Sequence, residues 1–306
     1  MPIDVGEIPD TLKRAARCGN LVPFIGAGIS RHAKSQVKYP FPSWTELISD
    51  LGTVALNHKN ISLRDKEEID GLVRQGKFLM AAQELEAAVQ EEYFIDFMRV
   101  RFGDTTAEPG LIHNLIFDLK PSLIVTTNYD RLLETAFFRK FNVPAEISTY
   151  KDAHEVERFI KKHERWVDKP LIFKIHGTVE KPAEVVFGEK SYRALRYHSP
   201  GYRAVLSAIF TTRVVLMLGF SFSDPEISAM METLRESLEH RASIDYIVLP
   251  RGAKGEVEKR RLKEDFGLIT IEYDETPSGD HSELIQFIKD LAGFVPLHAR
   301  GQSTSA

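Results

Sequence analysis

The chain has a single cysteine, Cys18, among 306 residues. One cysteine excludes an intramolecular disulfide, and it also excludes a four-cysteine zinc site within one chain, so we expect no bound metal. The sequence holds 40 Lys and Arg against 44 Asp and Glu, and no basic block stands out. A chain with this balance is not expected to bind nucleic acid directly.

Long hydrophobic runs are also missing. The N-terminus has no apolar stretch typical of a signal peptide, and the longest apolar runs, such as residues 214–218, are too short to span a bilayer. We therefore expect no membrane contact and a cytoplasmic location. The hydrophobic content of 43% suits one large domain over residues 1–295, followed by a disordered tail at 296–306.

Short apolar runs rich in β-branched residues alternate with helical patterns along the chain. Such runs are typical of buried parallel strands. The predicted strands are residues 21–25, 123–127, 171–175, 214–218, 244–249 and 268–271. The alternation predicts an α/β fold, a Rossmann-like doubly wound parallel sheet that binds its ligand at the carboxyl ends of the strands.

The connection between the first two predicted strands is unusually long. Residues 43–113 contain several helical patterns and no clear strand, whereas an ordinary crossover holds a single helix. We predict a helical insertion here, which is either a surface for homo-oligomer assembly or a set of solvated helices. Residues 150–169 and 185–197 are predicted to be irregular, with a short helical pattern at 154–163 and a further helix after 197.

The first predicted strand runs into a glycine turn formed by Gly26, Ala27, Gly28 and Ser30. Two glycines let a backbone approach a pyrophosphate closely, and the amides that follow can donate to it. The alternative is a turn that needs glycine only for its geometry. Arg31 stands where a dehydrogenase fingerprint has its third glycine, which counts against a dehydrogenase.

Polar residues end the next two predicted strands. The first ends in Thr127, Asn128 and Asp130; the second ends in His176 and Gly177. The Asn128 carboxamide can hold a water or a ribose hydroxyl, and an imidazole can bind hydroxyls or act as a general base. The alternatives are that Asp130 only caps the following helix and that His176 only bonds a loop carbonyl.

A fourth strand end carries Gly219, Ser221 and Asp224, followed by Pro225. Gly219 and Ser221 suit contact with the phosphate or adenosine ribose of a dinucleotide. Pro225 fits the first position of a helix, so Asp224 is expected to cap that helix. The alternative is an ordinary strand–loop–helix junction. Four polar strand ends of this kind would converge on one edge of one sheet.

The four strand ends together resemble the sirtuin family of NAD-consuming proteins. Sirtuins show a GAG-x-S turn, a T-x-N-x-D strand end, an H-G strand end and a later G-x-S strand end. Here these are residues 26–30, 126–130, 176–177 and 219–221, in the same order. The resemblance implies that NAD is the substrate and that its nicotinamide–ribose bond breaks. It further implies catalytic roles for Asn128 and His176 and a weaker one for Asp130.

The same resemblance implies how NAD is held. The Gly26–Ser30 turn would bind the pyrophosphate, Gly219 and Ser221 the adenosine half, and Thr127 and Asp224 would complete the binding wall. Asn128 would place a water, His176 would bind the ribose hydroxyls and help to remove a proton, and Asp130 would orient Asn128 or a ribose hydroxyl.

Departures from deacetylase sirtuins favour hydrolysis. Deacetylases follow the first motif with G-I-P-D-F-R, whereas residues 39–44 read Tyr-Pro-Phe-Pro-Ser-Trp, and their zinc cysteines are absent. Residues 219–227 look like bacterial antiphage sirtuin-like proteins, which resemble NAD glycohydrolases that deplete cellular NAD. By that resemblance, the trigger is a different chain, such as a HerA-type ATPase. An NAD-dependent deacylase and a non-catalytic NAD or ADP-ribose sensor remain alternatives.

Overall fold

The computed structural model describes residues 3–35, 41–103, 106–161, 169–222, 224–239, 244–275 and 281–296. The strands in this part of the chain form one eight-stranded sheet in the order β1-β8-β7-β6-β2-β3-β5-β4. Every neighbouring pair is parallel. The strands are β1 (Ile3–Asp4), β2 (Leu21–Ile25), β3 (Leu123–Thr126), β4 (Glu146–Thr149), β5 (Leu171–Lys174), β6 (Val214–Leu218), β7 (Asp245–Pro250) and β8 (Leu268–Tyr273).

The predicted doubly wound sheet is confirmed. From β2 the chain continues to its neighbour β3 on one side, and it later returns to β6 on the other side. The direction of winding therefore changes at β2 and β6, where open α/β sheets form a ligand-binding crevice. All six predicted strands are present as β2, β3, β5, β6, β7 and β8. The prediction missed β1 and β4, which are the two edge strands.

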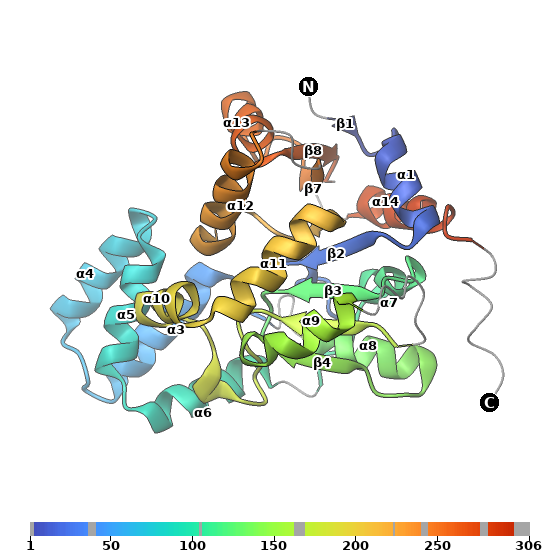
Figure 1. Ribbon diagram of the computed structural model, residues 1–306. Helices are drawn as coiled ribbons and strands as arrows, with labels where there is room; N and C mark the ends of the chain where they lie inside the picture. The colour runs from blue at the N-terminus through green and yellow to red at the C-terminus, as the bar shows by residue number, and fades with distance from the viewer. Residues whose placement is uncertain are drawn as a thin grey trace.

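Helices cover both faces of the sheet (Figure 1). One hydrophobic core lies under α1 (Asp10–Cys18), α7 (Leu111–Asp118), α8 (Leu132–Phe141) and α14 (Ser282–Ala292). The opposite core lies under α9 (Ala153–Lys161), α10 (Glu189–His198), α11 (Pro200–Thr212), α12 (Pro225–Ser237) and α13 (Glu256–Phe266). Apolar side chains alternate between the two faces along each strand, since successive residues of a strand point to opposite sides.

The prediction of an irregular stretch over residues 185–197 is wrong, because α10 begins at Glu189. Only Tyr192 and Leu195 of this helix are buried. Two buried residues make too thin an apolar stripe for helical periodicity to stand out in a sequence rich in charge.

The helical insertion packs around a hydrophobic core of its own. It consists of α3 (Trp44–Asn57), α4 (Leu63–Arg74), α5 (Phe78–Ala88) and α6 (Glu91–Phe102). In Figure 1 it lies at the left, beyond the ends toward which β2 and β3 point. The helix α7 instead packs with α8 and α14 against one face of the sheet, so the insertion ends before the predicted position 113.

Two capping boxes set where the insertion begins its helices. Ser43 and Glu46 exchange side-chain and backbone hydrogen bonds at the start of α3, and Ser62 and Asp65 do the same for α4. Among the described residues, no helix has both the length and the apolar character needed to cross a membrane. The predicted disordered tail lies, from residue 297 onward, outside the described residues.

Candidate active site

A large cleft lies between the carboxyl edge of the sheet and the insertion. Its volume is about 1170 Å³, above the usual range for a small-molecule pocket. One wall is formed by the loops after β2, β3, β5 and β6, and the other by the start of α3 and the turn between α4 and α5. All the candidate residues except Gly26 line this cleft: Ala27, Gly28, Ser30, Thr127, Asn128, Asp130, His176, Gly219, Ser221 and Asp224.

The glycine turn after β2 interlocks with the loop after β6. The Gly28 N–H donates to the Gly219 carbonyl at 2.8 Å. A Cβ on Gly26 would lie 2.5 Å from that carbonyl oxygen, and a Cβ on Gly28 would lie 2.8 Å from the Gly219 Cα. Gly219 itself has a φ of +62°, which favours glycine. The glycines at these positions are therefore required by backbone packing between two strand ends, and the Gly28 amide is committed to that contact.

Asn128 is the centre of a hydrogen-bond chain at the end of β3. Its Nδ2 donates to the Gly26 carbonyl at 3.0 Å and to the Ser30 hydroxyl at 2.9 Å. Because a carbonyl can only accept, these contacts fix which end of the amide faces the glycine turn. The Oδ1 atom is buried and has no hydrogen-bond partner among the described residues. An unpaired acceptor is thus held rigidly on a residue that lines the cleft.

Asp130 supports this arrangement through Ser30. The Ser30 hydroxyl donates to Asp130 Oδ2 at 2.6 Å, and the other carboxylate oxygen accepts from the Leu132 N–H at 3.0 Å. One oxygen thus bonds the first N–H of α8, as the capping alternative supposed, but from the residue before the N-cap Arg131. The second oxygen acts on Asn128 indirectly, since it orients the hydroxyl that Asn128 contacts.

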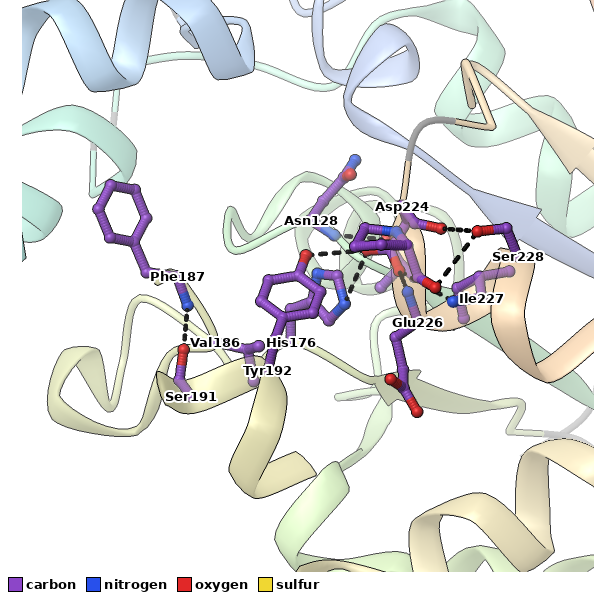
Figure 2. A network of polar contacts seen from close by, with 12 residues as sticks. Asn128, His176, Val186, Phe187, Ser191, Tyr192, Asp224, Glu226, Ile227 and Ser228 are labelled. Carbon is purple, nitrogen blue, oxygen red and sulfur yellow. Dashed lines mark hydrogen bonds and ion pairs between the residues drawn. The ribbon is translucent and has the colours of Figure 1, made fainter. Parts of the chain in front are cut away.

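His176 lies just beyond β5 and is only 4% exposed. Its Nε2 is 3.2 Å from Asp224 Oδ2, although the geometry at Nε2 falls short of a good hydrogen bond. Burial lowers the pKa of His176, and the nearby Asp224 carboxylate opposes that shift. The imidazole is therefore neutral near neutral pH. Figure 2 shows it next to Tyr192 and Asp224.

Asp224 makes contacts with each of its oxygens. The Oδ1 atom accepts from the Glu226 and Ile227 N–H groups, both at 3.0 Å, and so caps α12 as expected from the sequence. The Oδ2 atom accepts from the Tyr192 hydroxyl at 2.9 Å and faces His176 (Figure 2). The sequence around Asp224 gives no indication of this second set of contacts, because Tyr192 and Asp224 are 32 residues apart.

A buried ion pair beneath the site was also missed. The Lys174 Nζ donates to Glu134 Oε1 at 2.7 Å and to the Asp130 carbonyl, and the two side chains are 1% and 7% exposed. The lysine is thus tied to the backbone of the loop that carries Asn128. The sequence does contain a sign of this ion pair, since Lys174 is a charged residue inside an apolar strand pattern, two positions before His176.

The cleft continues toward the carboxyl ends of β7 and β8. There the His32 and His281 rings are 4.5 Å apart, and the Tyr273 hydroxyl is 2.9 Å from His281 Nδ1. Burial is the main cause that lowers the pKa of His32 to about 4, so this ring is neutral near pH 7. Within the described ranges, no three His, Cys, Asp or Glu side chains are grouped so that they could hold a metal ion.

Comparison with known families agrees with the sirtuin-like pattern of strand ends. Residues 122–271 match the model of the SIR2-like domain. That segment contains three of the four strand ends, those that carry Asn128, His176 and Gly219, while the glycine turn lies before it.

Curated relatives show similarity over more of the chain. A protein named NAD(+) hydrolase ThsA from Enterococcus faecium is 23% identical over 296 residues, which cover 89% of this chain and 55% of that protein. Defense-associated sirtuin 2 from Bacillus subtilis is 22% identical over 240 residues, covering 76% of this chain and 21% of the relative. NAD(+) hydrolase ThsA from Bacillus cereus is 27% identical over 139 residues, covering 45% and 28%. The chain thus spans about half or less of the length of these relatives.

Proposed function

We propose that this chain, which carries a SIR2-like domain at residues 122–271, is an NAD⁺ glycohydrolase that splits the nicotinamide–ribose bond with water. The observation that carries the proposal is the pairing of Asn128 and His176 on one wall of one cleft. Asn128 offers a fixed, unpaired acceptor and His176 a neutral imidazole. The names of two relatives as NAD(+) hydrolases support the same reaction.

The proposed reaction needs little acid catalysis. The bond between the ribose C1′ and the ring nitrogen breaks, and nicotinamide leaves as a neutral molecule with the bonding electron pair. Water forms the new bond to C1′ and loses one proton, so the products are nicotinamide, ADP-ribose and a proton. Asn128 Oδ1 would accept a hydrogen bond from the attacking water, and His176 would receive its proton and pass it to solvent. A positioned general base contributes about a hundred- to ten-thousandfold.

The other residues of the cleft would hold the dinucleotide. The Ala27 and Gly28 wall, with Thr127 beside it, would face the pyrophosphate, and Gly219 and Ser221 would face the adenosine half. Since the Gly28 amide already donates to Gly219, the turn would contact phosphate through other groups. Asp130 and Ser30 would keep Asn128 in place, and no metal would be needed.

Incubation of the protein with NAD⁺ alone tests this function. We expect nicotinamide and ADP-ribose to appear in equal amounts, measured by liquid chromatography, with no peptide present. Release that depends strictly on an acyl-lysine peptide would identify a deacylase instead. Calorimetric binding of NAD⁺ without any turnover, both alone and with the predicted ATPase partner, would identify a sensor, and either result would overturn the proposal.

The fall in the rate of NAD⁺ cleavage at low pH should reflect protonation of His176. A base works only when it is unprotonated, and burial holds the pKa of His176 below its ordinary value of 6.5, against the pull of Asp224. Activity should therefore persist as the pH falls to 6.5 and decline only below it. The measurement is kcat/KM for NAD⁺ from about pH 5 to pH 8. A decline that begins above 6.5 would show that His176 is not the neutral base.

The cellular role proposed here is that of an antiphage effector that depletes NAD⁺. The name of the Bacillus subtilis relative, defense-associated sirtuin 2, supports it. A homo-oligomer, a cytoplasmic location and a phage-sensing partner such as a HerA-type ATPase remain predictions. Light scattering of the purified protein and co-purification with the ATPase test the two assembly predictions.

A further inference from the structure

We propose that Asp224 and Tyr192 are positioning residues that fix the tautomer of His176, with the proton on Nε2 and the basic lone pair on Nδ1. The inference rests on the proposed function, because it assigns the nitrogen that would receive the proton of water. It gives the two residues a role beyond helix capping and packing.

The first support is that the two oxygens of the Asp224 carboxylate have different partners. Two backbone N–H groups at the start of α12 hold Oδ1, so the carboxylate cannot rotate freely. Oδ2 is thereby held 3.2 Å from Nε2 of His176, close enough for a strong electrostatic interaction although the angle falls short of a well-aligned hydrogen bond. An imidazole that turns its lone pair toward a carboxylate oxygen is repelled, whereas one that turns its N–H toward it is attracted. The neutral ring therefore carries its proton on Nε2.

Tyr192 supplies the second support. Its hydroxyl donates to Oδ2 at 2.9 Å, and its ring centroid is 5.2 Å from that of His176, at 68°. Burial first, and then the Asp224 charge, raise the pKa of Tyr192 well above its ordinary value, so the phenol remains a donor. The tyrosine both holds Oδ2 and limits the movement of the imidazole.

The helix α10 holds Tyr192 in place from both directions. One turn further along α10, Arg196 Nε donates to Glu226 Oε2 at 2.6 Å. Together with the bond from Tyr192 to Asp224, this contact joins α10 to the start of α12 at two points. At its start, the Lys190 N–H donates to Gln83 Oε1 of α5 at 2.7 Å. Tyr192 therefore sits on a helix anchored to both α12 and the insertion.

Asp224→Asn is the sharpest test because asparagine caps helices about as well as aspartate. The two N–H groups of α12 require an oxygen, so the carboxamide must turn its NH₂ group toward His176. That donor would reverse the tautomer and place the proton on Nδ1. We expect kcat for NAD⁺ cleavage to fall on the order of a thousandfold, within the range that a positioned general base contributes.

The tautomer can be read without any activity. Long-range ¹⁵N–¹H correlation spectra, with His176→Gln used to assign the signals, should show Nε2–H in the parent protein and Nδ1–H in Asp224→Asn. Tyr192→Phe should keep Nε2–H but lower kcat by about tenfold, since the carboxylate remains while its donor is lost. Ser62→Ala, which removes the cap at the start of α4, the end of that helix that does not line the cleft, controls for a general loss of stability and should leave kcat unchanged.

The outcomes separate this inference from the proposed function. If the parent protein releases nicotinamide but Asp224→Asn keeps the Nε2–H signal and a kcat within threefold, the positioning role is wrong. If the spectra reverse as expected while the parent protein does not consume NAD⁺, the positioning of His176 stands and the proposed function fails. A reversed tautomer together with a large loss of kcat supports both.

Discussion

Asn128→Ala is expected to lower the rate of NAD⁺ cleavage by about a hundred- to a thousandfold, the usual effect of removing one fixed polar group from a reacting centre. The loss follows from the geometry of the amide. Two hydrogen bonds hold Nδ2 against the glycine turn, so Oδ1 is a preorganised acceptor that alanine cannot replace. The rate should be measured as nicotinamide release under saturating NAD⁺, where kcat rather than KM reports the change.

Folding must be separated from chemistry in this variant. Loss of the two partly buried hydrogen bonds should cost about 1–2 kcal/mol of unfolding free energy, so the variant should remain folded. Asn57→Ala, at the exposed end of α3, is the matched control and should leave both rate and stability unchanged. Binding of ADP-ribose, measured by calorimetry, should persist in Asn128→Ala. A kcat within threefold of the parent protein would remove Asn128 from the mechanism.

The features that could be predicted from the sequence are those that produce a local pattern of apolar and polar residues. Strands buried on both faces, such as β2 and β6, appear as unbroken apolar runs because neither side meets water. The edge strand β4 was missed because its first two residues, Glu146 and Ile147, are exposed and break that pattern. Polar residues at the carboxyl ends of buried strands could therefore be located from the sequence, and with them most of the cleft wall.

Contacts between distant segments were not predictable in the same way. The interlock of Gly28 with Gly219 depends on β2 and β6 becoming neighbours. The contact of Tyr192 with Asp224 depends on how α10 packs against the start of α12. A glycine that accommodates another backbone looks, in sequence, the same as one that accommodates a phosphate. Only the close approach of the Gly219 carbonyl to this turn in the structure separates the two explanations.

The helix α10 illustrates the remaining difficulty. Its charged residues pair with other elements, as Arg196 does with Glu226, so much of its position is fixed by polar contacts. Hydrophobic periodicity does not register such contacts. The side chain that touches His176 was therefore located on a segment that the sequence predicted to be irregular.

Lys174→Met should have the largest effect on stability, a loss of about 3–5 kcal/mol in the free energy of unfolding. Methionine fills a similar volume but leaves the Glu134 carboxylate buried without its partner. It also removes the donor to the Asp130 carbonyl, in the loop that positions Asn128. Urea unfolding followed by circular dichroism measures the loss, and kcat of the remaining folded protein should fall as the loop loosens.

Two further variants show whether the unpaired charge is the cause. Lys161→Met removes an exposed pair with Glu157 and should cost less than about 1 kcal/mol. Adding Glu134→Leu to Lys174→Met should restore most of the lost stability, because an apolar pair can replace a buried ion pair. It should not restore kcat, since the loop carbonyl still has no donor. Recovery of full activity in the double variant would show that Lys174 serves only the packing of the core.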